Sequence, residues 1–410
     1  MKRIHGIFVG IAMVSVLAAA YTPVFAAQEQ GASPVVMLAK RTARKPPVLG
    51  DTLGLSGKLG EAIAQTPTGK GKGKIDTRGE KGFAGIPGAP KINYIIAILW
   101  AVWVGWIFST IGAFGGIMAG VGHITIFGLG DYAKSFKNTN PTLNKLLTDT
   151  IRVSNQFLVG LAAMISSINF YKQKRIILPL GIALGLGSIL GAWLIPELTA
   201  GKINLKEYIG YFGLAVFVIG AFIFYETTPK GQAGKKKAKA AAEAFQKAVK
   251  EKGVESAQGV HITHFGLKHV KFTFFGTEFS FSPWLPVLGG FFIAAIASFL
   301  GIGGGFLYVP FMTSVVGLPM FLVAGTSAVT VFIGMIVSIF SYVVIKGTFV
   351  SWSFIGVELI GIFIGAMIGP RTQKYIPDIW LKRVFVVLAL YVGLRYFSKG
   401  FFGVSWVPPY

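Results

Sequence analysis

Long apolar stretches recur along most of this 410-residue chain. They approach or exceed the roughly 20 residues with which an α-helix crosses a bilayer. These stretches are residues 92–129, 153–171, 176–196, 208–225, 284–318, 320–345, 349–369 and 384–397. Charged residues make up only 13% of the chain, whereas a typical soluble domain has about 25%. The sequence therefore predicts an all-α polytopic membrane protein.

The charge balance is strongly basic, with a formal net charge of +23. The Lys and Arg residues lie mostly in an N-terminal arm, a central linker and a short segment near residue 371. Such positions between apolar stretches are typical of topology determinants, so the pattern favours the lipid bilayer as partner and not a nucleic acid. The chain has no cysteine, which excludes disulfides and thiolate-bound metals. We predict no cofactor and no metal site.

Two segments precede the membrane region. Residues 1–26 have the features of a secretory signal peptide, with Lys2 and Arg3, an apolar core and the small-residue sequence VFA. Whether it is cleaved is left open. Residues 27–90 are rich in Gly, Pro and Lys and have no helical or strand periodicity, so we expect a flexible, basic, extracytoplasmic arm.

Beyond residue 91 the chain repeats itself in two pairs of motifs. In the first pair, LGLGSILGAWLIP, ending at Pro196, matches LIGIFIGAMIGP, ending at Pro370. In the second pair, GAFGGIM, beginning at Gly112, matches GIGGGFL, beginning at Gly301, at a somewhat longer interval along the chain. We therefore expect two homologous membrane repeats joined by a basic linker. The expected boundaries are 91–225 for the first repeat, 226–283 for the linker, 284–400 for the second repeat and 401–410 for a C-terminal tail.

The linker contains KKKAKAAAEAFQKAVKEK at residues 235–252, a helix-forming sequence with charges on almost every side. We expect a solvated helix. His261, His264 and His269 follow it. Three histidines could bind a metal, but the alternation of polar and apolar residues around them favours a β-hairpin or an interfacial segment.

The glycine-bearing runs, residues 92–129 and 284–318, could each cross the membrane once or turn back as a hairpin. Only the hairpin arrangement places most Lys and Arg of the short loops and the linker in the cytoplasm, as the positive-inside rule requires. Each repeat then has a glycine-broken hairpin and three spanning helices, and the two repeats are inverted. Inverted repeats with broken helices near the midplane are a transporter architecture. Free N–H groups at such breaks favour anions.

The second half resembles a known family. The motifs GIGGGFLYVPFM, GLP, VAGTSAV, IKGTFVSW and LKRVFVVLALYVGLRYF occur in order over residues 285–397. Together they resemble the sulfite exporter TauE/SafE family of anion permeases in the inner membrane. The resemblance implies a transporter of sulfite, organosulfonates or related sulfur-containing or organic anions, working by alternating access. Its small-anion substrate and the lipid bilayer are the implied partners, and a homo-oligomer is left open.

The candidate site residues fall into three groups. The first group could offer backbone amides to the anion, or could serve close helix packing: Gly301, Gly303, Gly304, Gly305, Gly115 and Gly116. The second group could offer polar side chains to it: Thr326, Ser327, Arg152, Ser154, Asn155 and Gln156. For Thr326 and Ser327 the alternative is helix capping, and for Arg152 it is an interfacial anchor or a partner of Asp149. The third group, His123 and Glu358, could couple protons to transport or could be structural.

Two other classes of function remain as alternatives. Ser327 and His123 at membrane depth would suit an intramembrane hydrolase, but no nucleophile motif surrounds the serine, so we do not expect an enzyme. A non-transporting membrane sensor or scaffold would use the basic arm and linker to bind partners. The spacing of Gly361, Gly365 and Gly369 by four residues predicts helix packing and not a ligand site.

Overall fold

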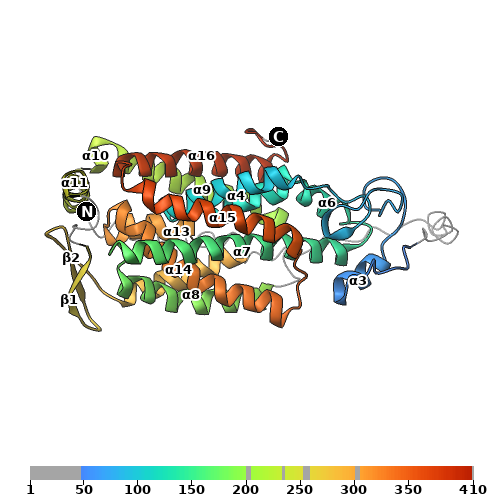
Figure 1. Ribbon diagram of the computed structural model, residues 1–410, viewed down its shortest axis with the longest axis horizontal. Coiled ribbons are helices and arrows are strands. Elements are labelled where there is room, and N and C mark those ends of the chain that lie inside the picture. Colours follow the sequence, from blue (N-terminus) through green and yellow to red (C-terminus); the bar gives the residue numbers. More distant parts are fainter. Residues whose placement is uncertain (1–47, 200–204, 233–235, 253–258, 301–304, 409–410) are drawn as a thin grey trace, which may run out of the picture. The chain divides into compact units, whose positions relative to one another are not determined.

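The computed structural model describes residues 48–199, 205–232, 236–252, 259–300 and 305–408, and this part of the chain is mostly helical (Figure 1). The helices before the linker are α3 (Gly57–Ala64), η1 (Phe83–Gly85), α4 (Tyr94–Ile111), α5 (Gly115–Val121), η2 (Gly122–Ile126), α6 (Leu129–Ser135), α7 (Pro141–Lys172), α8 (Leu178–Thr199) and α9 (Leu205–Thr227). The linker contains α10 (Pro229–Gln232), α11 (Lys236–Lys252), β1 (His261–Phe265), β2 (Val270–Phe274) and β3 (Thr277–Phe281). The remaining helices are α12 (Trp284–Leu300), α13 (Gly305–Pro310), η4 (Phe311–Val316), α14 (Met320–Phe340), η5 (Ser341–Ile345), α15 (Trp352–Gln373) and α16 (Asp378–Phe401).

The length and apolar character of the helices agree with a polytopic membrane protein. Five helical segments of the described residues are long and apolar enough to cross a membrane: α4, α7, α14 with η5, α15 and α16. Shorter apolar segments occupy parts of α8, α9 and α12. The proposed signal peptide at 1–26 lies outside the described residues.

The chain divides into two compact units. The first unit joins residues 48–90 to residues 132–147, which include most of α6 and the start of α7. The second unit contains residues 91–131 and the described residues from 148 onward. The first membrane repeat expected from the sequence, 91–225, includes residues 132–147, whereas the structure groups them with residues 48–90.

The first unit has a core of its own. Its buried side chains include Leu59, Ile63, Ile75, Phe83 and Ile86. Asn140 donates hydrogen bonds to the carbonyl of Ala62 at 2.7 Å and to the hydroxyl of Thr66 at 2.9 Å. Residues 48–90 are therefore not the flexible tether that the sequence suggested. The apolar residues are too widely spaced to give a helical or strand period, but they converge in three dimensions.

The second unit is held together by close helix pairs in which glycines face backbone. A methyl group at Gly361 or Gly365 of α15 would overlap the carbonyl of Ile98 or Val102 in α4. A methyl group at Gly369 of α15 would overlap the hydroxyl of Ser109 in α4. The packing role predicted for these three glycines is thus confirmed, since only a residue without Cβ permits this approach.

Two further pairs have the same character. Gly187 and Gly191 of α8 face the carbonyls of Val287 and Phe291 in α12. In the third pair, α9 and α16, Gly213 lies against Phe397 and Gly393 lies against Phe217.

Each glycine-bearing run contains a long helix followed by a shorter return helix, and not one continuous span. After α4 the backbone takes a left-handed conformation at Gly112 (φ 77°), and α5 then returns beside α4. The Trp100 indole of α4 donates to the carbonyl of Met118 in α5 at 3.0 Å. In the second run, a methyl group at Gly289 of α12 would lie 2.6 Å from the ring of Phe311 in η4. Both return helices, α5 and α13, continue directly into a π-helical turn.

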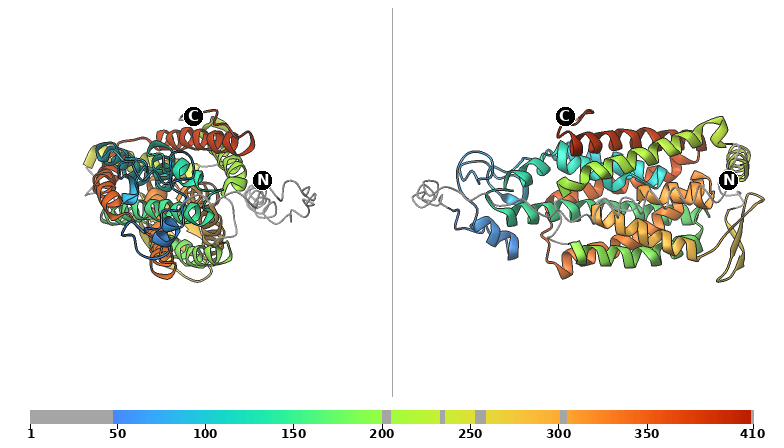
Figure 2. Two further views of the ribbon diagram at one scale, coloured as in Figure 1. Left: turned by 90° about the vertical axis from the view of Figure 1, so that its right-hand side faces the viewer. Right: turned by 180° about the vertical axis from the view of Figure 1, so that it is seen from behind.

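The linker folds onto one end of the long helices of the second unit, as Figures 1 and 2 show. The strands form an antiparallel sheet in the order β1-β2-β3, with Phe272 opposite Phe279. The strands predicted around the histidines are thus present. By contrast, α11 is not the fully solvated helix expected, because one face of it is buried. That face contains Ala238, Ala241, Ala242, Phe245 and Val249.

Candidate functional site

The first helix break meets the start of α13 in the interior of the second unit. The hydroxyl of Ser327 in α14 donates to the carbonyl of Gly112 at 2.9 Å. A methyl group at Gly305, the first residue of α13, would lie 3.3 Å from the same carbonyl. Gly112, Gly305 and Ser327 are buried, and we refer to these three residues as the break cluster. It joins elements of both proposed repeats.

The backbone next to Gly112 is strained. Phe114 precedes α5 with φ 66°, a left-handed conformation that costs a non-glycine residue about 1–3 kcal/mol. Its buried ring packs edge-on against Phe385 of α16 at 4.8 Å between ring centroids. Gly115 follows, and a methyl group there would lie 2.8 Å from the Phe108 ring. Packing from both sides therefore holds the break in place.

The glycine candidates are only partly covered by the structure. Gly115 and Gly116 begin α5 and are buried, and Gly305 begins α13. Gly301, Gly303 and Gly304 lie outside the described residues. The predicted role of their amides therefore stays a prediction.

The two hydroxyl candidates of α14 point to different neighbours. Ser327 contacts the break, as described above, whereas the hydroxyl of Thr326 accepts from the backbone N–H of Ile177 at 3.1 Å. Ile177 directly precedes α8, so Thr326 acts as a cap across helices. This agrees with the capping alternative for Thr326, on a helix other than its own.

Two polar candidates of α7, Arg152 and Ser154, contact residues outside the break cluster. Arg152 pairs with Asp149 at 3.3 Å and also interacts with the phenol of Tyr342. Ser154 donates to the carbonyl of Thr150, one turn earlier in the same helix. The pairing of Arg152 with Asp149 is the structural alternative that the sequence offered for this residue.

Two amides of α7 have unused acceptors. The side-chain oxygens of Asn155 and Gln156 are buried and have no hydrogen-bond partner among the described residues. The amide nitrogen of Asn155 faces Gly120 of α5, where a methyl group would lie 3.5 Å away. Asn155 is therefore next to the return helix of the first hairpin.

His123 and Glu358 form a buried pair, although 235 residues separate them in the chain. Nε2 of His123 in η2 lies 2.7 Å from Oε2 of Glu358 in α15, and both side chains are fully buried. Nδ1 of His123 and Oε1 of Glu358 have no hydrogen-bond partner among the described residues. Phe354 lies against the imidazole, at 5.1 Å between ring centroids. A cation contacts the same π-helical turn, since Arg395 donates to Thr125 at 3.1 Å.

Sequence reasoning missed several buried charges, and the first of them is Arg175 in the turn between α7 and α8. Its side chain is 1% exposed. It donates to the side chains of Gln173 and Gln373 and to the carbonyl of Phe321. Burial lowers the pKa of Arg175 to about 9, which still leaves the guanidinium charged at neutral pH.

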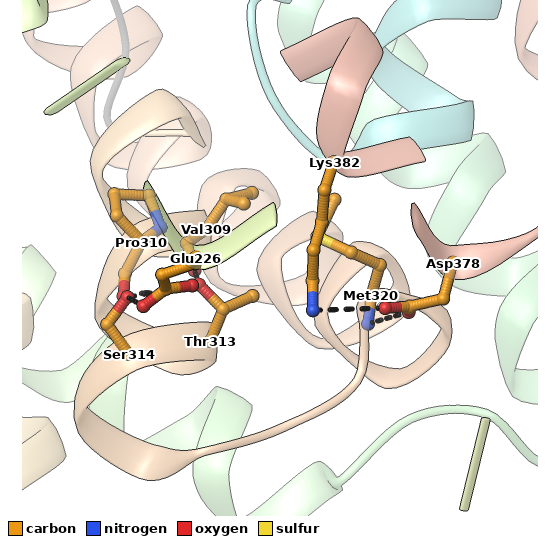
Figure 3. Close-up of polar contacts among 8 residues, drawn as sticks. All are labelled: Glu226, Val309, Pro310, Thr313, Ser314, Met320, Asp378 and Lys382. Carbon is orange, nitrogen blue, oxygen red and sulfur yellow. Dashed lines mark hydrogen bonds and ion pairs between the residues drawn. The ribbon is translucent and has the colours of Figure 1, made fainter. Parts of the chain in front are cut away.

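A second group of charges lies near the start of α14, and here each charge has a partner (Figure 3). Lys382 pairs with Asp378 at 3.1 Å, and Asp378 accepts from the N–H of Met320 at 2.7 Å. Ser314 donates to Glu226 at 2.7 Å. These contacts tie α16 to α14 and α9 to η4.

Comparison with known proteins decides the family. The family model described as "Sulfite exporter TauE/SafE" matches residues 97–396. The chain belongs to the TauE/SafE family. The resemblance proposed from the motifs of the second half is therefore confirmed, and the match extends through the first repeat and the linker. TauE/SafE proteins are membrane transporters and not enzymes.

One curated relative supports the same class of protein. A "probable membrane transporter protein" of Methanocaldococcus jannaschii is 33% identical over 121 residues, which is 28% of this chain and 45% of the relative. The alignment thus spans less than half of that relative. No solved structure matches the chain.

Proposed function

We propose that this TauE/SafE protein transports a small anion across the inner membrane, with sulfite or an organosulfonate as the substrate. The family membership supports the transporter class. The break cluster is the observation that carries the proposal of a site, because the helix break at Gly112 in the first repeat lies against α13 and α14 of the second. Unwound backbone inside a membrane protein is tolerated where it is buried or lines a substrate path.

An inverted-repeat architecture is part of the proposal, and the glycine contacts support it. Gly187 faces Val287 and Phe291, and Gly361 faces Ile98 and Val102. The interval between the two glycines is the one that relates the first pair of repeated motifs. The contacted residues Ile98 and Val287 are separated in the chain by the same number of residues as Gly112 and Gly301, the first residues of the second pair of repeated motifs. The π-helical turns η2 and η4 also begin at this separation. The repeats would rock against each other around the break cluster in alternating access.

Proton coupling through His123 and Glu358 is the second part of the proposal. A fully buried carboxylate and imidazole in contact can share one proton, and each has one further atom, without a hydrogen-bond partner among the described residues, that could exchange another. Movement of α15 relative to η2 would separate the pair and change its protonation. Asn155, Gln156 and Arg152 remain candidates for the path of the anion through α7.

Uptake into proteoliposomes tests the proposal. Purified protein in vesicles should accumulate labelled sulfite, sulfate, sulfoacetate or taurine faster than protein-free vesicles, with preference for one of them. A pH gradient, acidic outside, should increase the rate. If none of these anions enters faster than in protein-free vesicles, the substrate class is wrong, and a sensor or scaffold becomes the better account.

A further inference from the structure

The guanidinium of Arg175 is a buried positive charge without a carboxylate partner among the described residues. Its hydrogen-bond acceptors are the side chains of Gln173 and Gln373 and the carbonyl of Phe321, all of them neutral. Its Nε–H is buried and has no acceptor in the described part of the chain. Buried cations in proteins are normally paired, and buried N–H groups normally have an acceptor. Among these residues, Arg175 therefore lacks both a counter-charge and one hydrogen-bond acceptor.

Gln373 connects this charge to the first helix break. Its amide oxygen accepts from Arg175, and its amide nitrogen donates to the carbonyl of Thr110 at 2.7 Å. Thr110 lies just before Gly112, and its buried hydroxyl also has no hydrogen-bond partner among the residues described. Two polar groups without a partner among the described residues thus lie at the two ends of one glutamine bridge, and the Thr110 end is next to the first helix break.

Three aromatic rings enclose the guanidinium. The centroids of Phe170, Phe245 and Phe321 lie 4.8, 5.0 and 5.5 Å from Cζ of Arg175. Phe170 and Phe321 belong to the membrane helices α7 and α14, but Phe245 comes from α11 in the linker. Phe245 is therefore the one ring of the three that comes from the linker and not from a membrane helix.

We propose that Arg175 supplies the positive charge that receives the transported oxyanion, and that Phe245 of α11 is the cover over it. The inference rests on the proposed anion transport and names the residue that recognises the anion. An oxyanion of sulfur could accept from Nε–H of Arg175 and from the Thr110 hydroxyl, and it would neutralise the desolvated charge. Release of the α11 face would open the site towards the linker side.

Transport by substituted proteins is the first test. In phosphatidylcholine vesicles, which have no anionic headgroup to occupy the guanidinium, Arg175→Gln should reduce sulfoacetate and sulfate uptake at least tenfold. Arg175→Lys should reduce it several-fold, because the charge remains but the planar fork is lost. Lys382→Gln is the matched control, since Lys382 already has Asp378 as its partner, and its uptake should stay within twofold of the wild type. Wild-type uptake by Arg175→Gln would overturn the inference.

Chemical modification tests the site without transport. Phenylglyoxal, followed by peptide mass spectrometry, should leave Arg175 unmodified in the wild type and modify it in Phe245→Ala. Sulfoacetate or sulfate should protect it in that variant; sulfite is unsuitable because it adds to the reagent. Phe279→Ala, which removes a ring stacked on Phe272 in the sheet, should leave Arg175 unmodified.

The outcomes of the two tests separate the inference from the proposed function. If Phe245→Ala exposes Arg175 but neither anion protects it, Arg175 is a structural charge and the inference is wrong. If Phe245→Ala leaves Arg175 unmodified, α11 is not the cover. If the wild-type protein transports no anion, the proposed function is wrong. Protection of Arg175 from phenylglyoxal by sulfoacetate or sulfate would then still show whether Arg175 binds an anion.

Discussion

Individual side chains carry the chemistry, and the sequence identified some of them but not how they combine. His123 and Glu358 were each a candidate for proton coupling or for a structural role, yet no pattern connects residues on η2 and α15 that lie so far apart in the chain. Arg175 was not among the candidate site residues. Its position directly before an apolar stretch was the available signal, the same signal that drew attention to Arg152. Burial distinguishes the two: Arg152 is partly exposed and paired, whereas Arg175 is enclosed.

Glu358→Gln should uncouple transport from protons. The amide keeps the size of the side chain and can still accept a hydrogen bond from His123, but it cannot bind or release a proton at neutral pH. Uptake driven by a pH gradient should fall at least tenfold, whereas exchange of labelled for unlabelled anion should remain within about threefold of the wild type.

Glu226→Gln provides the control for this measurement. Glu226 is also a buried carboxylate, but it accepts a hydrogen bond from Ser314 of η4. Its variant should keep the gradient dependence. If Glu358→Gln responds to the gradient as the wild type does, the buried pair is structural.

Ser327→Ala should weaken both the fold and anion binding. Losing the hydroxyl leaves the carbonyl of Gly112 buried without that donor, which costs about 1–3 kcal/mol. The melting temperature in detergent should fall, and the rise in melting temperature on adding sulfoacetate should disappear. Ser154→Ala is the stability control, because that hydroxyl donates to the carbonyl of Thr150 in its own helix and alanine is the better helix former. Equal melting temperatures for the two variants would argue against the break cluster.

Helices and strands were predicted best where one residue type repeats at a regular spacing. Glycines four residues apart in α15 indicated close packing, and the structure has that packing against α4. The burial of α11 was not predicted, because its charged residues obscure a narrow face of Ala and Phe. The core of residues 48–90 was not predicted either, since its apolar residues follow no period. Contacts between residues distant in sequence decide both cases, and a local pattern does not record them.

Matched glycine substitutions test the helix pairs and their equivalence. Gly365→Ala should destabilise the protein by about 1–3 kcal/mol, because the methyl group would overlap the backbone of α4. Gly191→Ala, at the proposed equivalent position in α8, should cost a similar amount. Gly356→Ala in α15 has nothing within 4 Å and should be neutral or stabilising by up to about 1 kcal/mol. Melting temperatures would check all three, and a large difference between Gly191→Ala and Gly365→Ala would contradict the equivalence.

The chain as a whole contains a TauE/SafE region and, in addition, the arm and residues 132–147, which the family motifs did not predict. The family was predicted from the second half alone, and the family model confirms it over residues 97–396. The division into two units was not predicted, because residues 132–147 lie between membrane helices and yet pack with the arm. The proposed orientation, with the arm outside and the linker in the cytoplasm, rests on the distribution of Lys and Arg.

Cysteine labelling tests that orientation without background, since the chain has no native cysteine. Lys72→Cys in the arm and Lys268→Cys in the linker are both at exposed positions. In spheroplasts, a membrane-impermeant maleimide should label Lys72→Cys at once and Lys268→Cys only after permeabilisation. Labelling of Lys268→Cys in intact spheroplasts would contradict a cytoplasmic linker.

The position of a bound anion would decide whether the helix breaks form the transport site. A sulfonate that carries bromine, 2-bromoethanesulfonate, can be located by anomalous diffraction from crystals of the wild-type protein. We predict a single bromine peak directly beside the break cluster, with the sulfonate directed towards Arg175 and Thr110. A peak beside Arg152 and Asp149 on α7, with none at the break cluster, would contradict the account.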